Sequence, residues 1–176
     1  GMGMPSIGIY SYELFNFFDV DNIIRIGSAG GMCNKVKVRD IVIAQGACTT
    51  SRYSHTFNLP GDFAPISDFT VLRTTVEKAE ELGIKYEVGN VLSSDVFYGD
   101  TPEQSANWQK MGVLAVEMEA AALFMNAARA GKKAGALFTI SDHLVTGESL
   151  PAIERQNSFT DMMKLALETA VELENK

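Results

Sequence analysis

Four short groups of side chains that could bind a ligand or do chemistry stand at the ends of predicted strands. These groups are Arg25 with Ser28, Phe97 with Tyr98, Glu117 with Met118 and Glu119, and Ser141 with Asp142. Because open α/β sheets keep their chemistry at strand ends, we expect the four groups to share one pocket. Such a pocket would offer a cation for an anion, carboxylates for hydroxyl groups, aromatic faces for a flat ring, and an aspartic acid as a proton donor. This set fits a nucleoside and a phosphate.

The stretch Gly27–Gly31, with the sequence Gly-Ser-Ala-Gly-Gly, directly follows the strand-like run 23–26. Glycines after a strand can form a loop whose backbone N–H groups converge on an anion, although tight turns use glycine as well. The spacing does not match the dinucleotide-binding G-x-G-x-x-G pattern. The guanidinium of Arg25 beside such a loop predicts a phosphate clamp.

Glu117 and Glu119 stand on either side of Met118, where the predicted strand 113–116 becomes a helix. In an extended chain, residues i and i+2 share a face, so both carboxylates would point into the same cavity. Glutamates that open a helix are also common because they complement its dipole. The pattern alone leaves both interpretations open.

The run Leu137–Ile140 predicts a buried strand, which we expect to end at Ser141–His143 because strand interiors rarely contain such polar residues. Asp142 could serve as an acid there, or it could cap a turn. Arg155 lies in the first turn of the predicted helix 152–174, where a cation opposes the helix dipole. Such an unfavourable placement points to a function for Arg155.

Strand and helix patterns alternate along the chain, which indicates an α/β fold in a single domain over residues 1–176. The predicted helices cover 5–18, 70–82, 102–111, a segment ending at 130, and 152–174, and the predicted strands cover 23–26, 36–44, 87–93, 113–116 and 134–140. The segment 51–68 is a predicted loop. In the first helix we expect Ser6 to be the N-cap and an apolar face made of Ile9, Leu14, Phe17 and Phe18.

The net charge of −7 argues against a nucleic-acid polymer as a partner, because such proteins carry basic faces. The apolar runs are far shorter than the ~20 residues that a membrane span needs, so we expect no membrane association. The only cysteines are Cys33 and Cys48, and no signal peptide is visible. Both observations favour the cytoplasm.

Five motifs carry a resemblance to an enzyme family: Arg25-Ile-Gly-Ser28-Ala-Gly30, Asp95-Val-Phe97-Tyr98, Val116-Glu-Met-Glu119-Ala-Ala, Ser141-Asp142-His143 and Glu154-Arg155-Gln156. In this order, from about Gly3 to the last helix, the chain resembles the bacterial trimer-of-dimers (high-molecular-mass) purine nucleoside phosphorylases. The wider nucleoside phosphorylase superfamily shares the glycine stretch and the Glu-Met-Glu stretch, and the other three motifs narrow the match. The resemblance implies a mixed central sheet flanked by helices.

The resemblance also implies a reaction: phosphorolysis of purine ribo- or deoxyribonucleosides to the free base and the pentose 1-phosphate. It assigns the phosphate to Arg25, Ile26, Gly27, Ser28 and Gly30. It assigns the nucleoside to Met2, Phe97, Val116, Glu117, Met118, Glu119 and Ser141, with Glu119 on the ribose hydroxyls. Asp142, helped by Ser141 and Arg155, would protonate purine N7. The family works as a homo-oligomer, which is a hexamer. It needs no metal or organic cofactor, and phosphate is a co-substrate.

Family members carry a further N-terminal segment that contributes strands to the sheet, a glycine and an arginine to the phosphate site, and a histidine and an arginine to the neighbouring subunit. We find no counterpart here, and interpret His55 and His143 as structural or surface residues. We therefore expect an N-terminally truncated chain with an open, apolar sheet edge. We also expect an oligomer that covers this edge, in an arrangement that can differ from the family's hexamer, and weak or absent phosphorolysis.

Two alternatives remain open at this stage. The related methylthioadenosine/adenosylhomocysteine nucleosidases share the glycine stretch, Glu-Met-Glu and Ser-Asp, but their nucleophile is water. Arg25 argues against them, because an enzyme that excludes phosphate has no reason to place a cation there. The second alternative, motivated by the absent segment, is a chain that binds nucleosides without cleaving them.

Overall fold

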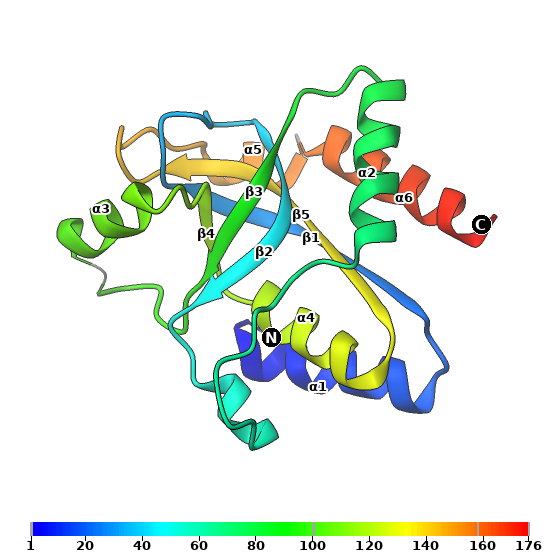
Figure 1. Cartoon of the computed structure of the whole chain (residues 1–176). Coiled ribbons are helices and arrows are strands. Elements are labelled where there is room, and N and C mark those ends of the chain that lie inside the picture. The colour runs from blue at the N-terminus through cyan, green and yellow to red at the C-terminus, as the bar shows by residue number, and fades with distance from the viewer. Residues whose placement is uncertain (1, 100, 158, 176) are drawn as a thin grey trace.

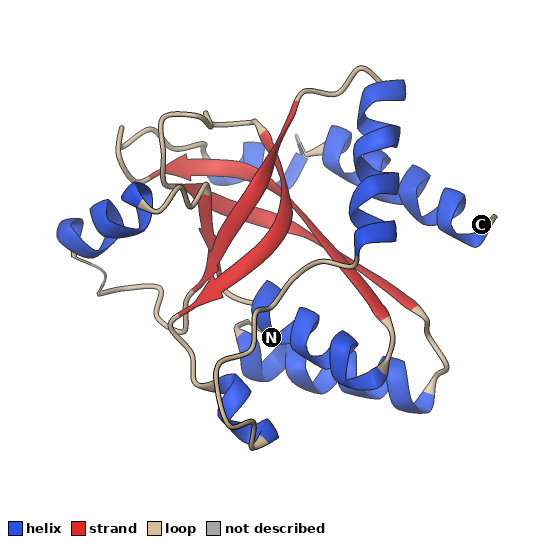
Figure 2. Ribbon diagram, in the orientation of Figure 1, coloured by secondary structure: helices blue, strands red, loops and turns tan. Residues whose placement is uncertain are grey.

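The computed structural model describes residues 2–99, 101–157 and 159–175. Within this part of the chain, a mixed sheet closes into a barrel in the order β1-β4-β3-β2-β5 (Figure 1). Its strands are β1 (Asn22–Gly31), β2 (Ile41–Thr49), β3 (Tyr86–Ser93), β4 (Ala115–Glu117) and β5 (Lys133–His143). Around them lie α1 (Met4–Phe17), the 3-10 helix η1 (Tyr53–Phe57), α2 (Phe69–Glu81), α3 (Pro102–Lys110), α4 (Ala120–Ala130), α5 (Ala152–Asn157) and α6 (Thr160–Glu174) (Figure 2). The predicted α/β fold with a mixed sheet is confirmed.

Two parallel strand pairs make up most of the barrel, and short antiparallel contacts join them. β1 runs parallel to β5 from Asn22 to Gly31, and β2 runs parallel to β3 along its whole length. β4 pairs with β3 and, at Gly30 and Gly31 only, with β1, whereas β2 also pairs with β5. The expectation of an open sheet edge is therefore wrong, because β4 and β5 connect the two pairs into a closed ring.

Two helix pairs cover the barrel on different sides, α1 with α4 and α2 with α6 (Figure 1). α4 is buried on all sides from Ala120 to Ala127, since its small residues let α1 approach on one side and the strands on the other. α6 buries Met162 and Leu165 against Ile43 and Leu137 of the sheet. None of the described helices is long and apolar enough to cross a membrane.

The predicted orientation of α1 is wrong. Its supposed apolar face points to solvent, with Ile9, Leu14, Phe17 and Phe18 between 38% and 69% exposed. The face that packs on α4 contains Met4, Gly8, Ser11 and Phe15. Small and polar residues are needed on this face because the side chain of Asn126 enters it. The N-cap is Gly3, at a φ of 84°, and not Ser6.

The other differences from the sequence-based prediction concern where elements begin and end. The glycine stretch Gly27–Gly31 is part of β1, and Ser141–His143 is part of β5. Residues 36–40 precede β2, the loop 51–68 contains η1, and the last predicted helix is divided into α5 and α6. Polar residues are tolerated in β5 because their side chains find partners inside the fold, as described below.

We predict that Asn126→Ala lowers the free energy of unfolding by about 2 kcal/mol, because it leaves buried polar groups without partners. The Nδ2 of Asn126 donates to the Gly8 carbonyl (3.0 Å) and to Ser11 Oγ (2.9 Å), and its Oδ1 accepts from Tyr53 Oη (3.1 Å). Chemical denaturation measures the change. The control is Asn16→Ala, which removes an exposed hydrogen bond and should cost less than about 0.5 kcal/mol. Equal losses in the two variants would contradict the role of Asn126.

Candidate active site

All four groups of predicted site residues line one cavity of about 970 Å³. β1 contributes Arg25, Gly27, Ser28 and Gly30; the turn after β4 contributes Met118 and Glu119; β5 contributes Ser141 and Asp142. Met2, Phe97, Tyr98, Val116, Glu117 and Arg155 complete the predicted set in the lining. Ile26 is the exception, because its side chain faces away and is 42% exposed. The strands thus bring together residues as distant in the sequence as Arg25 and Asp142.

The guanidinium of Arg25, which lines this cavity, lies between two carboxylates. Its Nη2 forms an ion pair with Glu119 Oε2 and lies 3.5 Å from Glu117 Oε2. The guanidinium also stacks 4.9 Å above the ring of Phe138. Its Nη1 is buried and has no hydrogen-bond partner among the described residues. One donor of the cation is therefore unsatisfied among the described residues.

Gly27 and Gly30 lie in β1 and not in the predicted loop, and they allow close packing over this strand. A Cβ on Gly27 would lie 2.6 Å from Nη1 of Arg25. A Cβ on Gly30 would lie 2.6 Å from Leu144 Cδ1 and 3.3 Å from Asp142 Oδ2. The glycines therefore make room for the two charged side chains that reach across the strand.

The carboxylate of Glu117 is almost completely enclosed by the chain. It accepts hydrogen bonds from the backbone N–H groups of Glu119 (2.9 Å) and Ala120 (3.0 and 3.1 Å), and from the hydroxyl of Ser93. Burial raises the pKa of this carboxyl, while the positive charge of Arg25 and the hydrogen bonds oppose that shift. Glu117 therefore satisfies the N–H groups at the start of α4, where a helix leaves its first donors unpaired.

Glu119 reaches Arg25 from the N-cap position of α4. Its Oε1 accepts a hydrogen bond from the backbone N–H of Gly3 (2.7 Å), and its Oε2 pairs with Arg25. The two glutamates converge on one cation as predicted, although Met118 and Glu119 form a bend after β4 and not an extended segment. Among the described residues, Gly3 and Arg25 are the partners of the Glu119 carboxylate, whereas Glu117 is fixed by the helix start.

Asp142 lies on the part of β5 that runs beside Gly30. Its Oδ1 accepts a hydrogen bond from the hydroxyl of Ser141 (2.7 Å). Arg155 lies in α5, where its Nε donates to the carbonyl of Leu150 (3.0 Å). Among the described residues, no ion pair joins Arg155 to Asp142, although both line the cavity.

His143 is buried and holds the turn that follows β5. Its Nε2 donates to the carbonyls of Cys33 (3.1 Å) and Val36 (3.2 Å), and its Nδ1 accepts from the N–H groups of Val145 (3.2 Å) and Thr146 (3.3 Å). This pattern requires a neutral ring with its hydrogen on Nε2. The structural interpretation of His143 is confirmed.

Phe97 and Tyr98 form the aromatic rim of the cavity. Their rings meet edge to face, with centroids 4.9 Å apart, and both are largely exposed. A planar ligand entering the cavity would cover this apolar surface, and Val116 lines the same cavity from β4.

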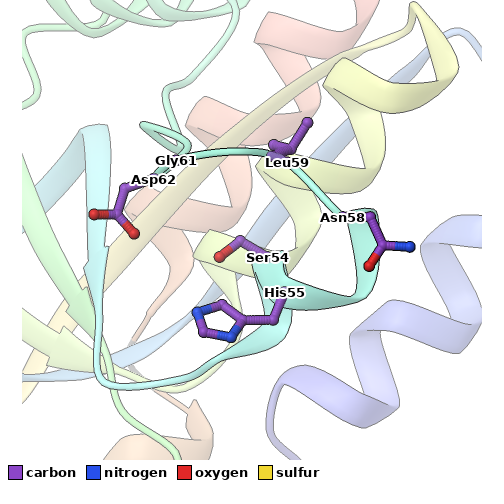
Figure 3. Close-up of a pocket in the computed structure, with 6 residues that line it drawn as sticks. All are labelled: Ser54, His55, Asn58, Leu59, Gly61 and Asp62. Atoms are coloured by element: carbon purple, nitrogen blue, oxygen red, sulfur yellow. The ribbon is translucent and has the colours of Figure 1, made fainter.

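A second hollow of about 450 Å³ lies over η1 and the loop that follows it, lined by Ser54, His55, Asn58, Leu59, Gly61 and Asp62 (Figure 3). It contains none of the predicted site residues. Across the described part of the chain, no group of three or more His, Cys, Asp or Glu side chains could hold a metal ion.

The sequence model of the phosphorylase superfamily matches residues 1–173. Three similar proteins are named DeoD-type purine nucleoside phosphorylases. The one from Clostridium beijerinckii is 49% identical over 99% of this chain and 74% of its own length. Those from Tolumonas auensis and Caldanaerobacter subterraneus are also 49% identical, over 97% of this chain and 72% and 73% of their own lengths.

The chain belongs to the phosphorylase superfamily. Within it, the chain is a member of the family of DeoD-type purine nucleoside phosphorylases, as the five motifs indicated. Two contacts of this phosphorylase site were missed from the sequence, the hydroxyl of Ser93 on Glu117 and the N–H of Gly3 on Glu119. A polar residue that ends the apolar run of β3 was the available signal for Ser93, whereas nothing local marks Gly3.

We predict that Gly27→Ala in this phosphorylase lowers the free energy of unfolding by about 1–3 kcal/mol, because its Cβ forces Arg25 away from Glu119. Gly61→Ala is the matched control, since a Cβ there meets nothing within 4 Å, and it should change stability by less than about 0.5 kcal/mol. Thermal and chemical unfolding measure both variants. A Gly27→Ala protein as stable as the control would show that Arg25 does not depend on this close approach.

Proposed function

We propose that the chain catalyses phosphorolysis of purine ribo- or deoxyribonucleosides, giving the free base and the pentose 1-phosphate. The observation that carries this proposal is the placement of Arg25, Glu119 and Asp142 on one cavity wall. These residues supply a cation for phosphate, a carboxylate for ribose hydroxyls and an acid for the base. Membership in the phosphorylase superfamily and the names of the relatives support the same reaction.

In the proposed reaction, a phosphate oxygen attacks C1′ while the bond between C1′ and N9 breaks. The electrons of that bond move onto the purine, and Asp142 in its acid form transfers its proton to N7, so the base leaves neutral. Ser141 holds the other carboxyl oxygen of Asp142. Arg155 is the cation that would stabilise the new carboxylate. The reaction needs no oxidant, and phosphate is the only co-substrate.

Phosphate binding at Arg25 follows from the donors that the guanidinium has left. Nη1 has no partner, and the neighbouring Ser28 is exposed to the cavity. Because Nη1 is buried, a dianionic phosphate would reach it only after the guanidinium moves, and would then satisfy it with a charge-assisted hydrogen bond. It would also compete with Glu119 for Nη2, which frees Glu119 for the ribose hydroxyls. Phe97 and Val116 would flank the base, with Met2 and Met118 against the sugar.

We also propose that the protein forms a homo-oligomer in which a second copy covers the outer face of α1. Large apolar side chains are exposed there: Ile9, Tyr10, Tyr12, Leu14, Phe17 and Phe18. Burying apolar surface of this kind stabilises an assembly.

We also propose a cytoplasmic location, which the two free cysteines support.

Arg25→Met should raise the KM for phosphate by tens- to thousands-fold, because losing a desolvated charged contact costs about 2–5 kcal/mol. Arg25→Lys keeps the charge but not the fork of donors, so its effect should be smaller. The control is Arg73→Met on α2, an exposed arginine paired with Glu77, which should leave the KM unchanged. Steady-state kinetics with inosine at varied phosphate provide the measurement. An unchanged KM for phosphate in Arg25→Met would contradict the phosphate clamp.

Asp142→Asn should reduce adenosine cleavage more than inosine cleavage. A carboxylic acid can transfer a proton to N7 without help from the 6-substituent of the purine. An amide can still donate a hydrogen bond to N7, but it cannot transfer a proton. The comparison is made on kcat/KM for the two nucleosides, with the exposed Asp62→Asn as the control. Equal losses on both substrates would argue against Asp142 as the proton donor.

A further inference from the structure

Ser93 is the last residue of β3, and its side chain is completely buried. Its hydroxyl donates to Oε1 of Glu117 and accepts from the backbone N–H of Ala121 (2.9 Å). The same hydroxyl therefore connects the end of β3 to the first turn of α4. A hydroxyl is the smallest group that can donate and accept at once in so closed a place.

Glu117 transmits this connection to the two residues that face the ligand. Its carboxylate accepts from the N–H of Glu119 (2.9 Å) and lies 3.5 Å from Nη2 of Arg25. Without the hydroxyl of Ser93, Oε1 of Glu117 would keep only the N–H of Ala120. The backbone N–H groups of Glu119 and Ala120 already donate to this carboxylate, so a lost donor would be replaced by the guanidinium of Arg25, which lies 3.5 Å away and can move. Arg25 would then move toward Glu117 and away from Glu119.

We propose that Ser93 is a positioning residue, which acts through Glu117 to hold Arg25 and Glu119 in the geometry that binds phosphate and ribose. This inference rests on the proposed function, since it takes Glu119 as the ribose contact. It separates the two glutamates by role: Glu119 meets the sugar, while Glu117 and Ser93 form the support beneath it.

The test compares Ser93→Ala with Ser11→Ala. Ser11 is also completely buried, and its hydroxyl also both donates and accepts, but it joins α1 to Asn126, away from Glu117. Dissociation constants are measured calorimetrically for inosine and for 2′,3′-dideoxyinosine, which lacks the 2′- and 3′-hydroxyls. Ser93→Ala should weaken inosine binding roughly tenfold and leave dideoxyinosine binding nearly unchanged, since one hydrogen bond to a charged group is at stake. Ser11→Ala should leave the ratio of the two constants as it is in the unchanged chain.

Ser93→Cys is the second variant, because a thiol is larger than a hydroxyl and leaves no cavity, but it is a weak donor. It should show the same selective loss even if Ser93→Ala does not fold. An unchanged ratio in the Ser93 variants, with lower thermal stability alone, would overturn the positioning role and leave the proposed function intact. Equal binding of the two nucleosides by the unchanged chain would overturn the ribose assignment of Glu119 and this inference with it. A chain that binds inosine more tightly than dideoxyinosine but never releases the base would overturn the proposed reaction. The ratio of the two dissociation constants would still decide the role of Ser93.

Discussion

The contact between one guanidinium and two carboxylates is the interaction on which the site depends. Glu117 and Glu119 lie two residues apart and face the same cavity, so without Arg25 their negative charges would repel each other in a partly enclosed space. Glu117 is fixed by the start of α4, and Glu119 is held by Gly3. The cation therefore holds the pair together, and its buried Nη1 has no hydrogen-bond partner among the described residues.

The closed sheet places this cation and the acid on the same wall. Parallel pairing of β1 with β5 sets Gly30 opposite Asp142, and the missing side chain of Gly30 lets the carboxyl lie over the strand. In the same way, the missing side chain of Gly27 makes room for the guanidinium of Arg25. A strand that provides both the charged residue and the space beside it positions a ligand more rigidly than a flexible glycine loop would.

Much of the site could be predicted from the sequence, because each of the four groups of site residues directly follows an apolar run that marks a strand. The fold class followed from the alternation of patterns. The roles of the glycines did not, since a loop and a closely packed strand use the same residue. The outward face of α1 was mispredicted because periodicity shows that a helix has an apolar face but not which side its neighbour covers. Ser93 and Gly3 act through contacts with residues distant in sequence. The polar end of β3 marks Ser93 but not its partner, and no local pattern marks Gly3.

The most direct measurement follows the release of hypoxanthine from inosine by this chain, with and without inorganic phosphate in the same buffer. The account predicts release that depends on phosphate and is matched mole for mole by ribose 1-phosphate. Equal release without phosphate would make water the nucleophile and would contradict the role given to Arg25. Nucleoside binding without any release in the presence of phosphate would contradict the proposed reaction and leave a binding protein.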